Sequence, residues 1–268
     1  MYVKQNAKQD NLESCYYSDI LASRNFIQID EIARLKNFVM PISGGEHKPE
    51  CDHLPSSSII IPYRNRTEQL GIFVNYMHHF LQKQRLHYRI FIVDQNNTNL
   101  FNRAKLLNIG AKVAIDNGYP CLILHDIDLI PLHYGNIYAC SKVPRHMSSS
   151  LDTFRYNLPY LTLFGGAVAI LSEQYKEING MSNLYEGWGG EDDDFYERLV
   201  KHNLTACRFC ASVSKYTMLR HEKNLKKSGD RFNLLKKATE RSNYDGLDSL
   251  NTEYTVQKKP LYTHIIVS

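Results

Sequence analysis

Three short apolar runs, separated by segments of helical periodicity, constrain the fold of this chain more than any other feature. The runs cover residues 58–61, 87–93 and 121–124. Between them, apolar side chains recur every three or four residues over 67–81 and again over 102–117. Strands that alternate with helices in this way predict a βαβαβ unit, and therefore an α/β fold with a mostly parallel central sheet.

Polar and charged residues follow each apolar run. The first run leads into Pro62-Tyr63-Arg64-Asn65-Arg66, the second into Asp94-Gln95 and the third into Asp126-Ile127-Asp128. Ligands of open α/β sheets bind beyond the carboxyl ends of the strands, so the three segments are expected to share one site. Arginine forks suit phosphate oxygens, and paired carboxylates suit a hard divalent cation that bridges to phosphates. A solvated turn after the third strand is the simpler alternative.

A second acidic segment reads Gly187-Trp188-Gly189-Gly190-Glu191-Asp192-Asp193-Asp194. Four consecutive carboxylates repel one another unless a helix N-terminus compensates the charge, and residues 192–202 have helical periodicity. Trp188 is the only tryptophan, and in a glycine-rich loop it could stack on a sugar or close over a ligand. The competing interpretation is an acidic helix cap beside a core tryptophan.

The remainder of the chain is less regular. Residues 161–171 are strand-like with a break at Gly165-Gly166, and a short helix is expected over 172–180. A basic amphipathic helix is expected over 231–241 and a pair of strands over 254–267. The polar residues that precede the globular part are expected to form an extended lead-in with one short helix near 30–38.

Composition limits the classes of function. With 268 residues, 43% of them apolar, the chain suits one large domain or two small ones. The net charge of +4 is spread along the sequence without a basic block among aromatics, which argues against nucleic acid as a partner. The sequence has neither a long apolar run nor a signal peptide, so we expect either a chain without its membrane anchor or a protein that is not secreted.

Six cysteines fit either disulfides or free thiols. Cys207 and Cys210 have CxxC spacing, but no second pair accompanies them, which disfavours zinc. From spacing alone, Met218 is expected in the core, and His221 is a weak candidate for a metal ligand.

Taken together, these segments resemble the β-1,4-galactosyltransferase family, in particular its invertebrate-type members. The resemblance runs from about residue 56 to residue 268, whereas residues 1–50 match little. It is carried by nine strings in the family order: IIIPYRNRTEQL, FNRAKLLNIG, LHDIDLIP, PRHMS, LPYLTLFGG, GWGGEDDD, MLRH, DGLDSL and PLYTHI.

The resemblance implies a GT-A type, Rossmann-like nucleotide-sugar transferase fold with a flexible Trp loop and a C-terminal lid. A stem-like segment at 1–54 would precede one catalytic domain at 55–268, with a nucleotide-binding half at 55–145 and an acceptor-binding half at 146–268. The implied reaction is an inverting, Mn²⁺-dependent transfer of galactose from UDP-galactose, in β-1,4 linkage, to a terminal N-acetylglucosamine of a glycoprotein or glycolipid. The implied location is the Golgi lumen, in a type II membrane protein whose anchor is absent from this chain.

Residue roles follow from the same resemblance. Asp192 maps to the catalytic base, with Glu191 beside it. The metal ligands map to Asp128, Met218 and His221, which overturns the core interpretation of Met218. Donor contacts map to Pro62, Tyr63, Arg64, Arg66, Arg103, Asp126, Ile127, Leu163 and Trp188. Acceptor contacts map to Tyr160, Phe164, Gly189, Gly190 and Asp193. The implied disulfides are Cys121–Cys140 and Cys15–Cys51, and Cys207 and Cys210 have no counterpart.

Leu163 departs from the family pattern, because vertebrate members carry a tyrosine there that crowds the C2 substituent of the donor. The smaller residue makes room for an N-acetyl group, so UDP-N-acetylgalactosamine is an alternative donor. Two other functions compete with transfer. One is a catalytically inactive glycan-binding or scaffolding relative, and the other is a cytosolic metal hydrolase, which leaves GWGGEDDD unexplained.

Overall fold

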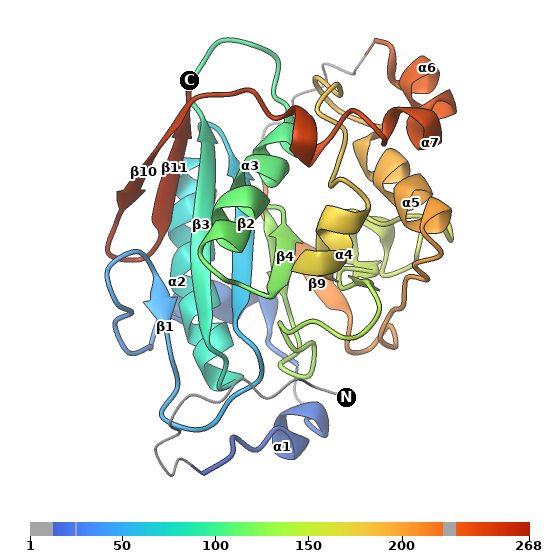
Figure 1. The fold of residues 1–268 in the computed structure, drawn as a ribbon. Helices are drawn as coiled ribbons and strands as arrows, with labels where there is room; N and C mark the ends of the chain where they lie inside the picture. The colour runs from blue at the N-terminus through green and yellow to red at the C-terminus, as the bar shows by residue number, and fades with distance from the viewer. Residues whose placement is uncertain (1–12, 25, 222–228) are drawn as a thin grey trace.

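The three expected strands are present and lie side by side in the computed structural model, which describes residues 13–24, 26–221 and 229–268. They are β2 (Ser57–Tyr63), β3 (Tyr88–Gln95) and β4 (Cys121–His125). β2 lies between β3 and β4 and is parallel to both, and β11 (Thr263–Val267) extends the parallel set beyond β3 (Figure 1). The α/β fold with a mostly parallel central sheet is thus confirmed.

Antiparallel strands complete both edges of the sheet. β10 (Tyr254–Lys258) forms the expected strand pair with β11. At the other edge, β8 (Ala167–Leu171) pairs with β4, and β6 (Arg145–His146) pairs with β8. The strand expected over 161–171 therefore begins only at Ala167, because Gly166 has a left-handed φ of +73° that interrupts extended backbone. A short strand, β1 (Glu46–His47), pairs with the start of β3.

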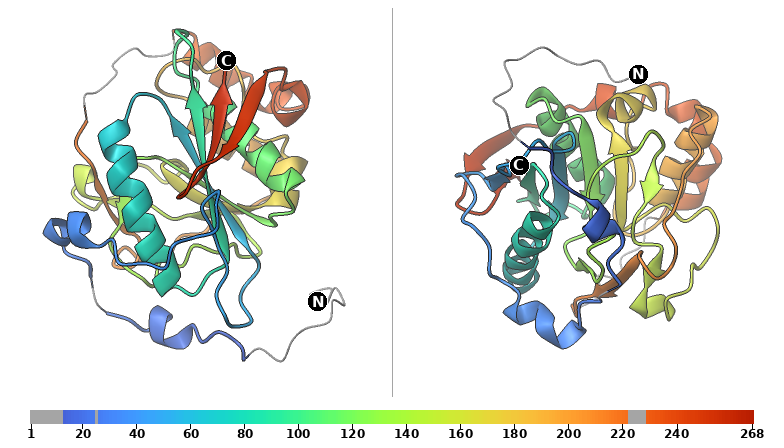
Figure 2. Two further views of the ribbon diagram at one scale, coloured as in Figure 1. Left: turned by 90° about the vertical axis from the view of Figure 1, so that its left-hand side faces the viewer. Right: turned by 90° about the horizontal axis from the view of Figure 1, so that it is seen from below.

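Helices cover both faces of the central strands. α2 (Thr67–Lys83) lies on one face and α3 (Arg103–Asp116) on the other, which is plain in the left view of Figure 2. Successive side chains of a strand point to opposite faces. Accordingly Ile59 and Ile61 pack in the cluster on the α2 side, whereas Ile60 packs in the cluster on the α3 side.

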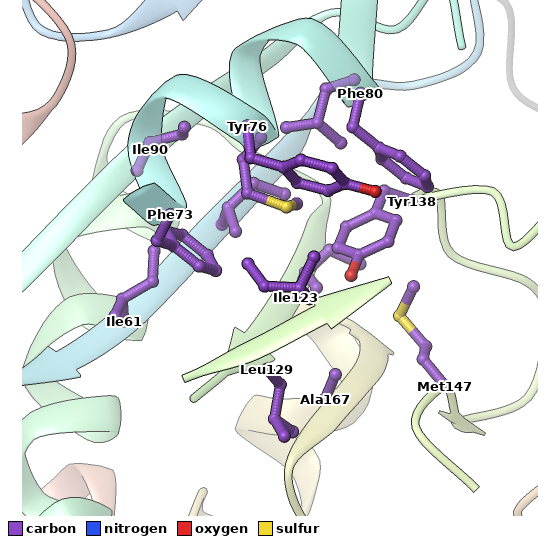
Figure 3. Close-up of a cluster of buried hydrophobic side chains, with 14 of the residues drawn as sticks. Ile61, Phe73, Tyr76, Phe80, Ile90, Ile123, Leu129, Tyr138, Met147 and Ala167 are labelled. Atoms are coloured by element: carbon purple, nitrogen blue, oxygen red, sulfur yellow. The ribbon is translucent and has the colours of Figure 1, made fainter. Parts of the chain in front are cut away.

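The cluster on the α2 side is rich in aromatic side chains. Phe73, Tyr76 and Phe80 of α2 pack toward the strands around Ile61 and Ile123 (Figure 3). The second cluster joins α3 to β8, to α4 (Ser172–Glu177) and to α5 (Glu191–Lys201). This packing fixes the start of α5, which carries the acidic run, against the sheet.

The N-terminal segment runs along the surface and includes α1 (Ser18–Leu21) and a 3-10 helix, η1 (Ile29–Arg34), close to the helix expected near 30–38. Ile27 and Ile32 of this segment are buried in the first cluster. Cys15 is bonded to Cys51 and Cys121 to Cys140, as the resemblance implied, while Cys207 and Cys210 are free. No helix among the described residues is long and apolar enough to cross a membrane.

A small second sheet continues from β4. Its order is β5-β9-β7, formed by β5 (Leu129–Pro131), β9 (Lys215–Met218) and β7 (Ser150–Leu151), with η2 (Asp152–Phe154) following β7. The helix expected over 231–241 is divided at Lys237 into α6 (Arg231–Lys236) and α7 (Ala238–Arg241), and η3 (Leu247–Ser249) follows.

Candidate active site

The Asp126-Ile127-Asp128 segment forms the turn between β4 and β5. Its backbone is held from both sides, since the amide of Asp126 donates to the carbonyl of Gly166 (3.0 Å) and the amide of Leu129 to that of Asp126 (3.3 Å). Ile127 is buried in the first core cluster, whereas the carboxylates of Asp126 and Asp128 are partly accessible. The buried isoleucine therefore anchors a turn that presents two carboxylates.

Arg103 connects this turn to the second acidic segment. Its Nε atom donates to Oδ1 of Asp126 at 2.6 Å, and its Nη1 atom lies 3.7 Å from Oε1 of Glu191. Arg103 can reach both because Asn102 caps α3, accepting a hydrogen bond from the amide of Lys105 and so fixing the start of the helix. Asp126 and Glu191 lie 65 positions apart in the chain, and one guanidinium joins them.

Glu191 and Asp192 occupy the first turn of α5, where the helix dipole favours negative charge. Burial, and next the charge of Asp192, raise the pKa of Glu191 to about 7, against the opposing effect of Arg103. Burial is also the largest cause of the raised pKa of Asp192, followed by Asp193. Both carboxyls are thus held in an environment that favours proton uptake.

Gly165 makes room for Asp192. A β-carbon on Gly165 would lie 2.7 Å from Oδ2 of Asp192, closer than van der Waals contact allows. The carbonyl of Gly165 accepts a hydrogen bond from Ser148, whose hydroxyl also accepts one from the amide of Ala167. The first glycine of the pair noted in the sequence as a strand break is therefore a close approach of backbone to a carboxylate, a role that only the structure reveals.

Asp194 belongs to a different environment from its acidic neighbours. It is fully buried, accepts from Nε of Arg198 at 2.7 Å and from the hydroxyl of Tyr185 at 3.0 Å, and pairs with Arg241. Asp245 contacts both arginines as well. The acidic run thus divides into three residues near the site and one that anchors α5 to α7.

The three residues mapped as metal ligands come together at the small sheet. Met218 of β9 is paired in register with Leu129 of β5, next to Asp128, and the amide of Leu219 donates to the carbonyl of Asp128 at 2.7 Å. Nδ1 of His221 lies 3.2 Å from Oδ2 of Asp128. Burial, and next Asp126, raise the pKa of Asp128 to about 6, as expected for a carboxylate that lacks sufficient nearby positive charge.

Asp152 is a supporting residue that sequence reasoning missed. Its carboxylate accepts hydrogen bonds from the hydroxyl of Thr217 and from the amide of Met218, the latter at 3.2 Å. It therefore fixes the end of β9 where Met218 stands. The side chain of Met218 is partly buried against the first core cluster. Among the described residues, His, Cys, Asp and Glu alone form no cluster of three that could hold a metal.

The residues mapped to the donor lie around the end of β2. Pro62 and Tyr63 are buried at the end of the strand, and Arg66 stands immediately before α2, where its charge opposes part of the increase in the pKa of Asp128. Arg64 points to another loop, where its Nη1 atom donates to the carbonyl of Asn99 at 2.6 Å and its guanidinium lies 5.2 Å from the centre of the Phe101 ring.

The residues mapped to the acceptor divide into exposed and buried ones. The hydroxyl of Tyr160 donates to Oδ1 of Asp193 at 3.0 Å. Phe164, in contrast, is buried, with its ring 5.5 Å from that of Phe195, so it supports the site from behind. An open groove of about 390 Å³ lies here, lined by Tyr160, Thr162, Asp193, Tyr196, Glu197 and Leu235.

The glycine-rich loop ahead of α5 exposes its aromatic residue. Trp188 is 66% exposed, which excludes the core tryptophan considered from the sequence. Gly189 and Gly190 have φ values of +104° and +95°, and Gly190 is the N-cap residue of α5. A β-carbon on Gly190 would lie 2.8 Å from the ring of Tyr185. Glycine is therefore required at this position both by backbone conformation and by space.

Two family descriptions match the chain. Residues 16–141 match the N-terminal region of glycosyl transferase group 7, and residues 145–222 match the family described as the N-terminal domain of galactosyltransferase. Mouse β-1,4-galactosyltransferase 1 is 42% identical over 84% of this chain and 58% of its own length. Chinese hamster (Cricetulus griseus) β-1,4-galactosyltransferase 4 is 39% identical over 84% of this chain and 67% of its own length. The chain thus spans just under three fifths of the first of these relatives.

Solved structures with the same fold come from Drosophila β1,4-galactosyltransferase 7. The catalytic domain in complex with xylobiose has 28% identity and a TM-score of 0.67, covering 80% of this chain and 93% of that one. A mutant of the same enzyme in complex with manganese, UDP-Gal and xylobiose has 27% identity and a TM-score of 0.68, with the same coverage.

Proposed function

Because this chain belongs to the β-1,4-galactosyltransferase family, we propose that it transfers galactose from UDP-galactose, with Mn²⁺, to the 4-hydroxyl of a terminal N-acetylglucosamine. The acceptor sugar would end a glycoprotein or glycolipid glycan. The proposed catalytic domain comprises residues 55–268, with a nucleotide-binding half at 55–145 and an acceptor-binding half at 146–268. The proposed location is the Golgi lumen, and the two disulfides favour such an oxidising compartment.

The observation that carries this proposal is the contact of Arg103 with both acidic segments. Asp126 and Glu191 approach the same guanidinium, and Asp192 follows Glu191 directly in the first turn of α5. In this proposal, the donor-side carboxylate Asp126 and the base Asp192 would flank one site. Two raised pKa values, those of Glu191 and Asp192, accompany this geometry, and perturbed carboxyls of this kind cluster at functional sites.

Asp128, Met218 and His221 would hold the metal ion. The fit rests on a carboxylate and an imidazole 3.2 Å apart beside a thioether-bearing strand, and on the raised pKa of Asp128, which a cation would reverse. Oxygen and nitrogen ligands suit Mn²⁺, whereas a thioether is an unusual ligand for a hard ion. When bound, the ion would stabilise the negative charge of the UDP leaving group.

Asp192 would act as general base in a single displacement. As the acceptor hydroxyl attacks C1 of the galactose from the face opposite UDP, its proton passes to the carboxylate and the bond from C1 to the phosphate oxygen breaks. A raised pKa suits a base that must take up this proton near neutral pH. Glu191, held near Arg103, would orient the sugar beside Asp192, and Tyr160 with Asp193 would bind the acceptor.

Leu163 leaves the identity of the donor sugar open to test. Leu163 is partly buried and lies two residues before Gly165, whose backbone packs against Asp192. A leucine in place of the family tyrosine would admit the N-acetyl group of UDP-N-acetylgalactosamine as well as UDP-galactose. Trp188, Pro62, Tyr63, Arg64, Arg66 and Ile127 complete the proposed donor site, and Gly189 and Gly190 the acceptor side.

A transfer assay tests the proposal directly. The purified chain is incubated with UDP-galactose or UDP-N-acetylgalactosamine and an N-acetylglucosamine glycoside, with Mn²⁺ or with a chelator, and the disaccharide is quantified. We expect a β-1,4-linked product that depends on Mn²⁺ and disappears in Asp192→Asn. Binding of UDP without any product, in folded protein with metal, would contradict transfer and identify a glycan-binding relative instead.

A further inference from the structure

The segment from Tyr160 to Gly165 borders the proposed site at both of its ends but belongs to no helix or strand. Tyr160 lines the acceptor groove, and Gly165 contacts Asp192. Within the segment, the amide of Leu163 donates to the carbonyl of Tyr160 at 3.2 Å. One short turn of this kind does not fix the position of six residues, so other contacts must hold the segment against the rest of the protein.

Arg208 supplies those contacts. Its Nη2 atom donates to the carbonyl of Leu161 at 2.7 Å and to the carbonyl of Leu163 at 2.9 Å. Its Nε atom donates to Nδ1 of His146 at 3.2 Å. The guanidinium therefore donates hydrogen bonds from one edge to the segment and from another edge to His146 of β6 in the central sheet.

His146 is a rigid support for this arginine. It is buried on β6, which pairs with β8. Because Nδ1 accepts from Arg208, the ring proton lies on Nε2 and the imidazole is neutral. Burial, and next the charge of Arg208, lower the pKa of His146 to about 3, which keeps the ring neutral over the physiological range.

We propose that Arg208 is a positioning residue that fixes the backbone of Leu161–Leu163 against His146, and so sets where Tyr160 and Leu163 stand relative to Asp192. The consequences for transfer rest on the proposed function, whereas the anchoring itself does not. Arginine suits this role because its planar fork directs several N–H groups in fixed directions, which the single ammonium of a lysine does not.

Hydrogen–deuterium exchange of the ligand-free chain tests the anchoring. Wild type is compared with Arg208→Ala, Arg208→Lys and Arg34→Ala, an exposed arginine on η1 that serves as control. In Arg208→Ala we expect the peptide that covers residues 160–165 to exchange about tenfold faster or more, with the core strands unchanged. Arg208→Lys should restore part of the protection, and Arg34→Ala should leave it as in wild type.

Steady-state kinetics test the consequence. A displaced Tyr160 should raise the acceptor KM of Arg208→Ala about tenfold, and a displaced Leu163 should alter the ratio of galactose to N-acetylgalactosamine transfer. Arg208→Lys should lie between that variant and wild type. A residue with only a structural role would instead lower the amount of active enzyme and leave KM and the donor ratio unchanged.

The outcomes separate the two proposals. Unchanged exchange at residues 160–165, or an equal increase throughout the chain, would overturn the positioning role of Arg208. A local increase in exchange in a protein whose wild type transfers no sugar would support the positioning role and refute the proposed function.

Discussion

Gly165 and Asp192 are packed so closely that a β-carbon on the glycine would lie 2.7 Å from a carboxylate oxygen of the aspartate. Gly165→Ala should therefore push Asp192 out of place and lower kcat/KM by about tenfold to a hundredfold. The effect on stability should be small by comparison, since the obstructing atom belongs to a side chain that can move. Transfer rate and melting temperature, measured on the same preparation, check this expectation.

Gly71→Ala is the matched control for that substitution. Gly71 lies in α2, and a β-carbon there meets nothing within 4 Å. Alanine in a helix interior is favoured over glycine by roughly 0.5–1 kcal/mol, so this variant should be slightly more stable and fully active. Equal activity of the two variants would show that Gly165 does not determine the position of Asp192.

Asp192→Asn should abolish transfer while leaving nucleotide binding intact. The amide has the same shape as the carboxylate but cannot accept the proton, and general-base catalysis is typically worth about 10²–10⁴-fold in rate. Calorimetric titration with UDP and Mn²⁺ should give an affinity close to that of wild type. Asp116→Asn, at an exposed residue paired with Lys112, serves as the control and should retain full activity. Transfer by Asp192→Asn at more than a tenth of the wild-type rate would exclude Asp192 as the base.

Leu163→Tyr should shift donor use toward UDP-galactose. The larger ring would occupy the space that an N-acetyl group needs at C2 of the donor, and steric exclusion of this kind is commonly worth about 1–3 kcal/mol. The ratio of kcat/KM values for the two UDP-sugars is the quantity to compare between wild type and variant. A ratio that does not change would show that residue 163 has no part in donor choice.

Arg198→Met should destabilise the fold far more than it affects chemistry. Arg198 is fully buried and bonded to Asp194, and its removal would leave Asp194 with Arg241 as its one remaining charged partner among the described residues. Breaking a buried ion pair typically costs about 3–5 kcal/mol. The Lys112–Asp116 pair is exposed, so Lys112→Met should change the free energy of unfolding by well under about 1 kcal/mol. Denaturant unfolding curves of both variants measure this difference.

Buried histidines should make the fold sensitive to acid. Burial lowers the pKa of His78 and His125 to about 4 and that of His146 to about 3, from the ordinary histidine pKa of about 6.5. Between pH 6.5 and 4 the unfolded chain binds protons at these rings that the folded chain does not, so stability falls as the pH falls. The raised pKa values of Asp128 and Glu191 act in the opposite direction over the same range.

A variant isolates the contribution of one histidine from these opposing effects. One pKa unit corresponds to about 1.4 kcal/mol. When the pH falls from 7 to 4, the free energy of unfolding of His78→Gln should therefore decrease by roughly 3 kcal/mol less than that of wild type. Unfolding free energies at a series of pH values give the two curves. Parallel curves would show that His78 titrates in the folded state as it does in the unfolded chain.

Local patterns were sufficient to predict the main elements. The apolar runs that became β2, β3 and β4 and the periodic segments that became α2 and α3 were placed to within a few residues. The antiparallel edge at β8 and the division of the last helix at Lys237 were not predicted. Both depend on residues that are distant in the chain but adjacent in space. β8 pairs with β4, some 45 residues earlier, and the local hydrophobic periodicity does not indicate such a partner.

The acidic run shows the same limit at the level of single side chains. Successive residues of a helix are turned by about 100°, so Asp192 and Asp194 must point to nearly opposite sides of α5. The sequence predicts this opposite orientation, but it does not indicate which side of α5 faces the site. The buried arginines decide it, since Arg198 and Arg241 bind Asp194 inside the protein and leave Asp192 against Gly165.

By itself the sequence determined the order of strands and helices, the two acidic segments and the family to which they belong. Periodicity and short motifs are properties of residues that are neighbours in the chain, so they can be recognised from the sequence alone. Only the tertiary structure placed Met218 beside Asp128, joined Asp126 to Glu191 through Arg103, and set Arg208 against Leu161 and Leu163. These contacts join residues that lie roughly 20 to 90 positions apart, and they exist because packing of the sheet, and not proximity in the chain, brings the side chains together.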